Sequence, residues 1–375
     1  MSILEAALWV SVGLWALSGA WALLNILLIS GLPTEQSGIP LPSLSVVIPA
    51  RDEEKWIEAA VASHCSQEYP DLEVVVVDDG STDRTPEVLA RLQERFPNLV
   101  VLQGEEPTGG WLGKTNALRQ GLNRTSGDFV LIADADVRYA PETHRRAVAE
   151  MVRRELDMLV LLPHHEGPWG AELIVMHLDA IFLFAVPSFL YNASRPRGFA
   201  LGAGAGNMIR REALDRAGGI EAVKGEIIDD IALGRRVKAL RGRLRVVTAF
   251  DEVRVQMYGS FGEAFDGFTK NLYAFIGFGL WGVALGVGGL FYHCLPLGAL
   301  AFAAWIPKPI LLPAALAVSL ELTLETATCV WSRHRLWLAP LFPVRIILWM
   351  ALLVRSAWRY HRRGLVWRGR AYGKR

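Results

Sequence analysis

Residues 129–137 read FVLIADADV, a short apolar run that ends on two carboxylates. A continuous apolar run of this length is typical of a strand covered on both faces in a parallel sheet. Alternate side chains of an extended backbone point the same way, so we expect Asp134 and Asp136 on one side and Ala135 on the other. Two carboxylates placed like this can hold a hard divalent cation, which usually also takes phosphate oxygens as ligands.

The chain upstream of this run alternates between strand and helix patterns. Further apolar strands are predicted at 44–48, 73–77 and 100–103, and helical spacing of apolar residues occupies 54–65 and 116–122. This alternation predicts a doubly wound α/β domain, in which ligands collect at the carboxyl ends of the parallel strands.

Two more polar loops follow predicted strands. Carboxylates there can accept hydrogen bonds from a base or a ribose hydroxyl, although Asp in such a loop can equally be a local turn cap. Because three such loops converge on one sheet edge, the sequence favours a binding site. The first loop contains Pro49, Ala50, Arg51, Asp52 and Glu53, and the second contains Asp78, Asp79 and Gly80.

The two ends of the chain have the composition of membrane segments. Residues 6–29 are apolar for more than twenty positions, enough to cross a bilayer as a helix. A second apolar block, 272–357, divides into segments near 274–306, 310–331 and 337–357. The first of these is too long for one crossing, and Pro296 is a candidate break.

Some polar residues lie inside these apolar stretches. Glu321, Glu325 and Arg345 are expected to snorkel or to pair between helices, because isolated charges are costly in hydrocarbon. Residues 171–191 are also apolar but are interrupted by polar side chains and a proline, and we expect an interfacial helix there.

These patterns predict the domain organisation and the location of the protein. Residues 1–32 form an N-terminal transmembrane helix, 41–270 the α/β domain, 272–357 the C-terminal transmembrane helices and 358–375 a basic tail. By the positive-inside rule the tail is cytoplasmic, so an even number of crossings separates it from a cytoplasmic α/β domain. We expect a multi-pass protein of the inner or plasma membrane. With 39 basic and 38 acidic residues, nothing suggests a nucleic-acid partner.

Four motifs within residues 44–136 carry a family resemblance. In chain order they are SVVIPARDEE, VVVVDDGSTDRT, GGWLGKTNALRQG and ADADV. They resemble the ordered motifs of family 2 glycosyltransferases with the GT-A fold, and EIIDDIAL at 226–233 is similar to the acidic element of that family. The GGWLGK segment and the basic tail further resemble membrane-bound carotenoid-type and hopanoid-associated glycosyltransferases.

The resemblance implies a role for each matching residue. Asp134 and Asp136 would lie at the ribose and at Mg2+ or Mn2+, with Asp136 as the favoured direct ligand of the metal. Asp230 would be the catalytic base that deprotonates an acceptor hydroxyl, with adjacent Asp229 as its competitor. The nucleotide-sugar donor would contact Pro49, Ala50, Arg51, Glu53, Asp79, Lys114 and Asp134.

The sequence also departs from the family pattern. The Gln-x-x-Arg-Trp motif of processive members is absent, and that region carries Lys270 instead. Lys270 would either supply a positive charge to the donor diphosphate or snorkel at the start of a membrane helix. The missing motif argues against a processive polysaccharide synthase.

The resemblance therefore implies a membrane-anchored, metal-dependent, inverting hexosyltransferase. It would move a sugar from a nucleotide-sugar, with a UDP-sugar expected, to a lipid-embedded hydroxyl such as that of a hopanoid or carotenoid. One alternative is a polyprenyl-phosphate sugar synthase, which differs in its acceptor. The other is a non-catalytic lipid-binding or assembly protein that kept the fold.

Overall fold

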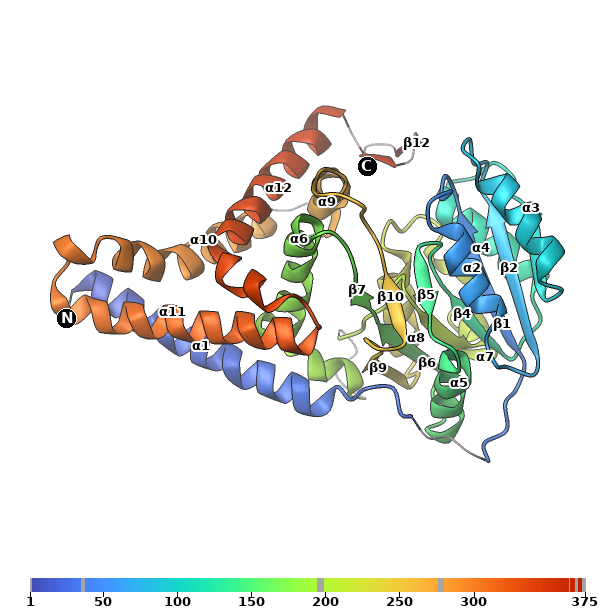
Figure 1. The fold of residues 1–375 in the computed structure, drawn as a ribbon, viewed down its shortest axis with the longest axis horizontal. Helices are drawn as coiled ribbons and strands as arrows, with labels where there is room; N and C mark the ends of the chain where they lie inside the picture. Colours follow the sequence, from blue (N-terminus) through green and yellow to red (C-terminus); the bar gives the residue numbers. More distant parts are fainter. Residues whose placement is uncertain are drawn as a thin grey trace. The chain divides into compact units, whose positions relative to one another are not determined.

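The computed structural model describes residues 2–34, 38–193, 199–275, 280–363, 365–367 and 370–372. The chain forms two compact units (Figure 1). The α/β unit comprises residues 29–166 and 189–256, and the helical unit comprises residues 1–28, 167–188 and 257–375. Residues 167–188 and 257–270 thus belong to the helical unit, although they lie within the range 41–270.

One large sheet organises the described part of the α/β unit. Its seven strands run in the order β3-β2-β1-β4-β8-β6-β9. The pairs β3/β2, β2/β1, β1/β4 and β6/β9 are parallel, whereas β8 is antiparallel to both β4 and β6. The strands are β1 (Leu44–Ala50), β2 (Leu72–Asp78), β3 (Leu99–Gln103), β4 (Phe129–Ile132), β6 (Met158–Leu162), β8 (Asn207–Arg210) and β9 (Leu244–Thr248). The predicted α/β fold is confirmed.

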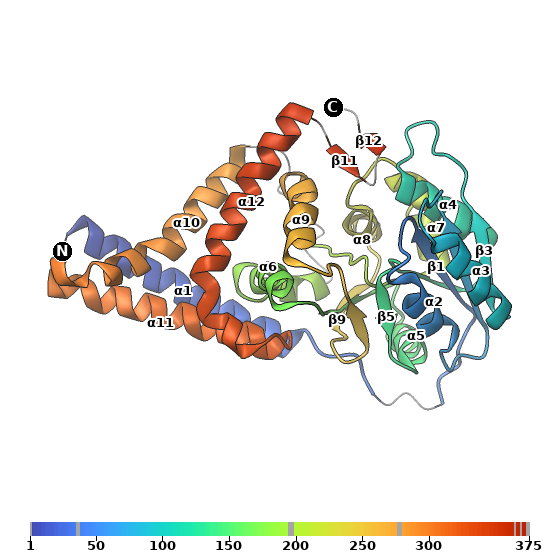
Figure 2. The ribbon, with the colours of Figure 1, turned by 45° about the horizontal axis from the view of Figure 1, so that its top comes forward.

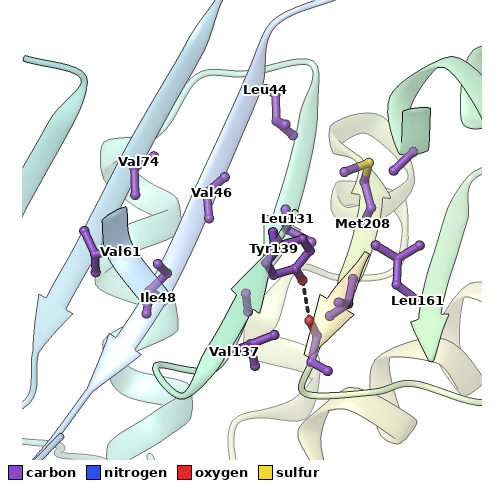
Figure 3. Close-up of a cluster of buried hydrophobic side chains, with 14 of the residues drawn as sticks. Leu44, Val46, Ile48, Val61, Val74, Leu131, Val137, Tyr139, Leu161 and Met208 are labelled. Atoms are coloured by element: carbon purple, nitrogen blue, oxygen red, sulfur yellow. Dashed lines mark hydrogen bonds between the residues drawn. The ribbon is translucent and has the colours of Figure 1, made fainter. Parts of the chain in front are cut away.

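The central strands bury both of their faces, which explains their continuous apolar sequences. On β2, Val74 and Val76 pack into the main core with β1 and β4 residues (Figure 3), while Val75 and Val77 pack against Ala117 of α4. Gly121 of α4 allows close approach, because a Cβ there would lie 2.5 Å from Val47. The helices of this unit are α2 (Ile57–Cys65), α3 (Thr85–Arg95), α4 (Gly113–Arg124), α5 (Thr143–Arg153), α7 (Arg211–Arg216) and α8 (Asp229–Ala239).

A small second sheet extends from the end of β4. It contains β5 (Val137–Tyr139), β10 (Val253–Val255) and β7 (His164–His165) in the order β5-β10-β7. β5 begins directly after the ADAD turn, so the small sheet holds the far side of that turn in place.

The helical unit contains the expected long apolar helices. Its helices are α1 (Ile3–Leu28), α6 (Trp169–Ala180), α9 (Phe261–Phe275), α10 (Leu280–Ala301), α11 (Lys308–Trp331) and α12 (Phe342–Arg363), followed by the hairpin β11 (Leu365–Trp367) and β12 (Arg370–Tyr372). Among the described residues, three helical segments are long and apolar enough to cross a membrane: Ile3–Leu28, Lys308–Trp331 and Leu336–Arg362. α10 continues through Pro296, so the expected break does not fall at this proline.

Two layers of helices pack within this unit. α1 and α11 lie side by side, and α10 contacts both of them at an angle (Figures 1 and 2). α6 packs with α9 and α12 through Ile174, Phe268 and Trp349. Residues 170–176 of α6 are all buried within this unit, and the interfacial position expected for 171–191 stays a prediction. Directly after α6 the chain makes a π-helical turn, whose Leu183 carbonyl accepts a hydrogen bond from Asn25 at 2.7 Å.

The charged residues within the apolar helices are paired, which was one of the two arrangements expected from the sequence; the other was snorkelling. Arg345 of α12 donates to Glu325 of α11, and His293 of α10 contacts Glu321 of α11. The side chains of Glu321, Glu325 and Arg345 are fully buried. Helix pairing, not snorkelling, therefore accommodates these three charges.

Candidate active site

The parallel strands bring the three acidic loops to one edge of the large sheet. β1 and β2 end side by side, with Ala50 opposite Asp78, and the N–H of Asp79 donates to the Ala50 carbonyl at 2.8 Å. β4 ends at Ile132 opposite Val47 of β1, so the ADAD turn follows at the same edge. The predicted convergence of the loops is present.

The first two loops are cross-linked by hydrogen bonds. Arg51 Nη1 donates to the backbone carbonyl of Asp79 at 2.6 Å and lies 3.7 Å from its Oδ2. Asp52, at a φ of 54°, accepts from the backbone N–H of Thr82 at 2.7 Å. The N–H of Glu53 donates to the hydroxyl of Thr85, the first residue of α3, at 2.8 Å. These contacts hold the first two loops together at the ends of β1 and β2.

Pro49 and Ala50 contribute to this edge through their backbone. Both lie in β1, and Ala50 is 1% exposed with its side chain in the core. A ligand at this strand end therefore meets the backbone here and the side chains of the residues that follow.

The ADAD turn presents its carboxylates as the sequence suggested. Asp134 and Asp136 are partly exposed, and Ala135 between them is buried. The backbone turns here and does not continue the strand, since β4 ends at Ile132 and β5 begins at Val137. The predicted alternation of exposed and buried side chains at residues 134–136 is therefore present although the backbone turns.

Lys114 joins two of the acidic elements. It lies in the first turn of α4, and its Nζ is 2.8 Å from Asp134 Oδ1 and 3.5 Å from Asp229 Oδ1. Burial favours the neutral amine, but the surrounding carboxylates of Asp134, Asp229 and Asp230 outweigh it and raise the pKa of Lys114. Lys114 is therefore a fixed positive charge between the metal-binding candidates and the base candidates.

The two candidate bases begin α8 and differ in their surroundings. Asp229 is 6% exposed and contacts Lys114, and burial raises its pKa. Asp230 is half-buried, and its Oδ1 accepts the N–H of Ile231 at 2.7 Å. Burial and the neighbouring Asp229 carboxylate raise the pKa of Asp230 to about 6. A carboxyl group tuned in this way is a stronger base than a solvated aspartate.

A glycine-rich loop at residues 202–206 packs directly against both acidic elements. A Cβ on Gly202 would lie 2.0 Å from the backbone oxygen of Asp230, and one on Gly204 would lie 2.2 Å from Asp134 Oδ2. The carbonyl of Gly204 also accepts the N–H of Asp134 at 2.9 Å. Because Gly202 and Gly204 have no side chains, this one loop can pack against both Asp134 and Asp230.

Tyr139 holds this loop from the core side and was missed by the sequence analysis. Its buried hydroxyl donates to the Ala205 carbonyl (Figure 3), and a Cβ on Gly206 would lie 2.7 Å from the same hydroxyl. The Tyr139 ring packs against the rings of His64 and His144. The Nδ1 atom of His64 lies 3.0 Å from the Nε2 atom of His144. The sequence near Tyr139 indicates only an alternating strand after the ADAD turn, and the contact with Ala205 is visible only in the structure.

The two expected metal ligands suit a divalent cation that is shared with a substrate. Within the described residues, no group of three or more His, Cys, Asp or Glu side chains is arranged to hold a metal ion. Mg2+ and Mn2+ in phosphate-transferring sites often take only one or two carboxylates, completed by substrate phosphates and water. The partly exposed pair Asp134 and Asp136 fits that donor set. Lys270 lies on α9, and its side chain is outside the described residues.

The fold and this acidic sheet edge define a glycosyltransferase of the GT-A type. The chain belongs to glycosyl transferase family 21, whose pattern matches residues 7–375. The expected family number, 2, is thus not confirmed, whereas the GT-A fold is. A mannosyltransferase from Pyrobaculum calidifontis, solved with GDP-Man and Mn2+, has the same fold, with a TM-score of 0.55 and 22% identity over 96% of this chain and 99% of that chain.

Two groups of relatives act on lipids by name. A beta-monoglucosyldiacylglycerol synthase from Synechocystis sp. is 34% identical over 54% of this chain and 42% of that protein. A 4,4'-diaponeurosporenoate glycosyltransferase from Staphylococcus aureus is 28% identical over 61% of this chain and 60% of that protein. The chain thus spans less than two thirds of the length of either relative.

Proposed function

We propose that this protein is a membrane-anchored, inverting glycosyltransferase that moves a sugar from a UDP-sugar to the hydroxyl group of a membrane lipid. The names of the relatives support a lipid acceptor, with hopanoids and carotenoids as the first classes to test. The long apolar helices support a multi-pass anchor, with the α/β unit and the basic tail in the cytoplasm. An anchor raises the effective concentration of an acceptor that does not dissolve in water.

One observation carries the proposal. Lys114 lies between Asp134, which follows β4, and Asp229, at the start of α8, with Asp230 adjacent. This places a divalent-cation candidate, a cation for phosphate and a base candidate around one point at the carboxyl edge of the sheet. Transfer from a nucleotide-sugar needs these three kinds of group together.

Asp230 is the residue that we assign as base. Asp229 is nearly fully buried and is engaged by Lys114, whereas Asp230 is partly open and has a raised pKa. In the proposed step the acceptor oxygen forms a bond to the anomeric carbon while the bond from that carbon to the diphosphate oxygen breaks. The hydroxyl proton passes to Asp230, and one displacement inverts the anomeric configuration.

Asp136 and Asp134 are the residues that would hold Mg2+ or Mn2+. The cation would offset the charge that develops on the leaving diphosphate. Lys114 would contact the same diphosphate, since its ammonium group already lies at the acidic edge. Arg51, Glu53 and the Asp79 loop would bind the nucleoside, together with the backbone at Pro49 and Ala50. Lys270 stays a candidate for the diphosphate.

The test is a transfer assay with the detergent-purified protein. A panel of nucleotide-sugars is supplied with a lipid extract and with Mg2+, Mn2+ or chelator. We expect chelator-sensitive transfer into lipid from one donor, with transfer abolished in Asp136→Ala and reduced at least about a hundredfold in Asp230→Asn. Asp215→Asn, at an exposed position on α7, is the matched control and should retain full transfer.

Two outcomes would overturn parts of the proposal. Full transfer by Asp230→Asn would remove the base assignment, and transfer to a polyprenyl phosphate in place of a hydroxyl would identify the alternative synthase. A folded protein that neither binds nor turns over any donor would support the non-catalytic alternative.

A further inference from the structure

The C-terminal helix α12 differs from the other long helices in where its charges lie. α1 from Ala6 to Leu28 and α10 carry no Asp, Glu, Lys or Arg, and the two glutamates inside α11 are fully buried. On α12, the side chain of Arg355 is about half exposed and lies 2.9 Å from Asp266 of α9, and Arg362 is exposed as well. In sequence, α10 and the parts of α1 after Glu5 and of α11 after Lys308 therefore have no exposed charge to place in hydrocarbon, whereas α12 has.

The apolar part of α12 is too short to cross a bilayer as a helix. Thirteen helical residues, 342–354, precede the exposed Arg355. At about 1.5 Å per residue they span about 20 Å, against about 30 Å of hydrocarbon. The segment Leu336–Arg362 reaches spanning length only by including Leu336–Leu341, a 3-10 turn that contains Pro340 and packs back on α11.

The arrangement within the helical unit points the same way. α1 and α11 run side by side, whereas α12 runs steeply across them and alongside α9 (Figures 1 and 2). α12 joins α9 and α6 in one buried cluster. If α1 and α11 cross the bilayer, a helix so inclined to them lies closer to the membrane plane.

The exposed face of α12 suits a lipid surface. Its large exposed apolar side chains are Val344, Ile347, Val354 and Trp358, at helical spacing along one side. Arg362 stacks on Trp358, with its guanidinium 5.1 Å from the ring centre. Apolar side chains flanked by tryptophan and arginine are characteristic of helices that lie in the headgroup region of anionic membranes.

The number of crossings also favours a surface position for α12. α10 and α11 are neighbours joined by the short turn 302–307, so together they make two crossings. α12 then starts on the side of the membrane from which the chain entered α10, which is the side of the α/β unit. With the α/β unit in the cytoplasm, as proposed above, a crossing α12 would carry its C-terminal arginines to the opposite side, against the positive-inside rule.

We propose that α12 is a membrane-surface helix that rests on the anionic leaflet on the α/β unit's side of the membrane, and that α1, α10 and α11 are the spanning helices. Its apolar face enters the headgroup boundary, and Arg359 and Arg362 meet the lipid phosphates. The placement does not depend on sugar transfer, so it can be tested in a variant without activity.

The first experiment determines the side of the membrane on which each segment lies. Cysteine is introduced at Trp305 in the α10–α11 turn, at Arg362 on α12 and at Arg91 on the α/β unit, all exposed positions. Sealed vesicles are labelled with a membrane-impermeant maleimide, with the unsubstituted protein as background. We expect Arg362→Cys and Arg91→Cys to react from one side and Trp305→Cys from the other. Reaction of Arg362→Cys from the Trp305 side would overturn the proposal.

The second experiment measures depth. A spin label on Val354→Cys, in vesicles containing anionic lipid, should lie about 5–10 Å inside the headgroup boundary. Leu14→Cys on α1 serves as the deep reference and Arg91→Cys as the aqueous one. A mid-bilayer depth or a fully aqueous position at Val354 would each refute a surface helix.

Discussion

Replacing Tyr139 with phenylalanine removes one hydroxyl and tests how the glycine-rich loop holds the acidic site. Burial raises the pKa of Tyr139, so its hydroxyl stays a protonated donor to the Ala205 carbonyl. Its histidine neighbours are neutral, since burial lowers the pKa of His64 to about 3 and that of His144 well below its usual value. Loss of this buried hydrogen bond should cost about 1–3 kcal/mol of stability.

Tyr69→Phe is the matched control for this substitution. Tyr69 also donates its hydroxyl to a backbone carbonyl, that of Pro42, and it packs against the same core. It is half-buried, so its loss of stability should fall at the lower end of the same range. Its partner Pro42 lies just before β1, at the opposite end of that strand from the acidic loops. Both variants therefore lose one tyrosine hydroxyl, but only Tyr139→Phe loses a hydrogen bond to the glycine-rich loop.

The assay is transfer activity as a function of Mn2+ concentration. Loosening residues 202–206 frees the N–H and carboxylate of Asp134 from their contacts with Gly204. If holding Asp134 in place contributes about 1 kcal/mol to the free energy of Mn2+ binding, its loss in Tyr139→Phe should raise the half-maximal Mn2+ concentration about fivefold. It should stay unchanged in Tyr69→Phe. Equal metal dependence in both variants, with equal loss of stability, would refute a positioning role for Tyr139.

Three further predictions concern separate elements. Gly204→Ala places a methyl group against Asp134 and should lower turnover at least about tenfold in a folded protein, whereas Gly31→Ala makes only ordinary contacts and should not. The raised pKa of Asp230, about 6, predicts that transfer increases with pH through that value, while its contribution to stability declines between about 4 and 6. Arg345→Met leaves a buried carboxylate unpaired and should destabilise the helical unit by about 3–5 kcal/mol, measured by thermal unfolding in detergent.

The sequence predicted the fold because its strongest signals are local. The four parallel strands are continuous apolar runs, and each ends on polar residues that the sheet then gathers at one edge. Residues 134–136 kept their alternation because Ala135 is small enough to be buried between two carboxylates.

The parts that were missed depend on contacts between distant segments. Tyr139 acts on residues 202–206, more than sixty positions away, and nothing in its own neighbourhood reveals that contact. The burial of α6 depends on residues of α9 and α12, which the composition of α6 alone does not reveal. By contrast, the composition of 337–357 suits a spanning helix, and our placement of α12 on the membrane surface depends on the exposure of Arg355, which only the structure shows.

The charge of the site argues for the role of a cation in donor binding itself. Asp134, Asp136, Asp229 and Asp230 lie at the sheet edge with Lys114 among them, so the carboxylates outnumber the ammonium group even with one proton shared. A like-charge pair at 4 Å costs about 4 kcal/mol near a protein surface, and a diphosphate brings more than one such charge. Chelator should therefore weaken binding of UDP by more than about a hundredfold, measured by calorimetry. Equal affinity for UDP with and without metal would show that Lys114 alone compensates the diphosphate.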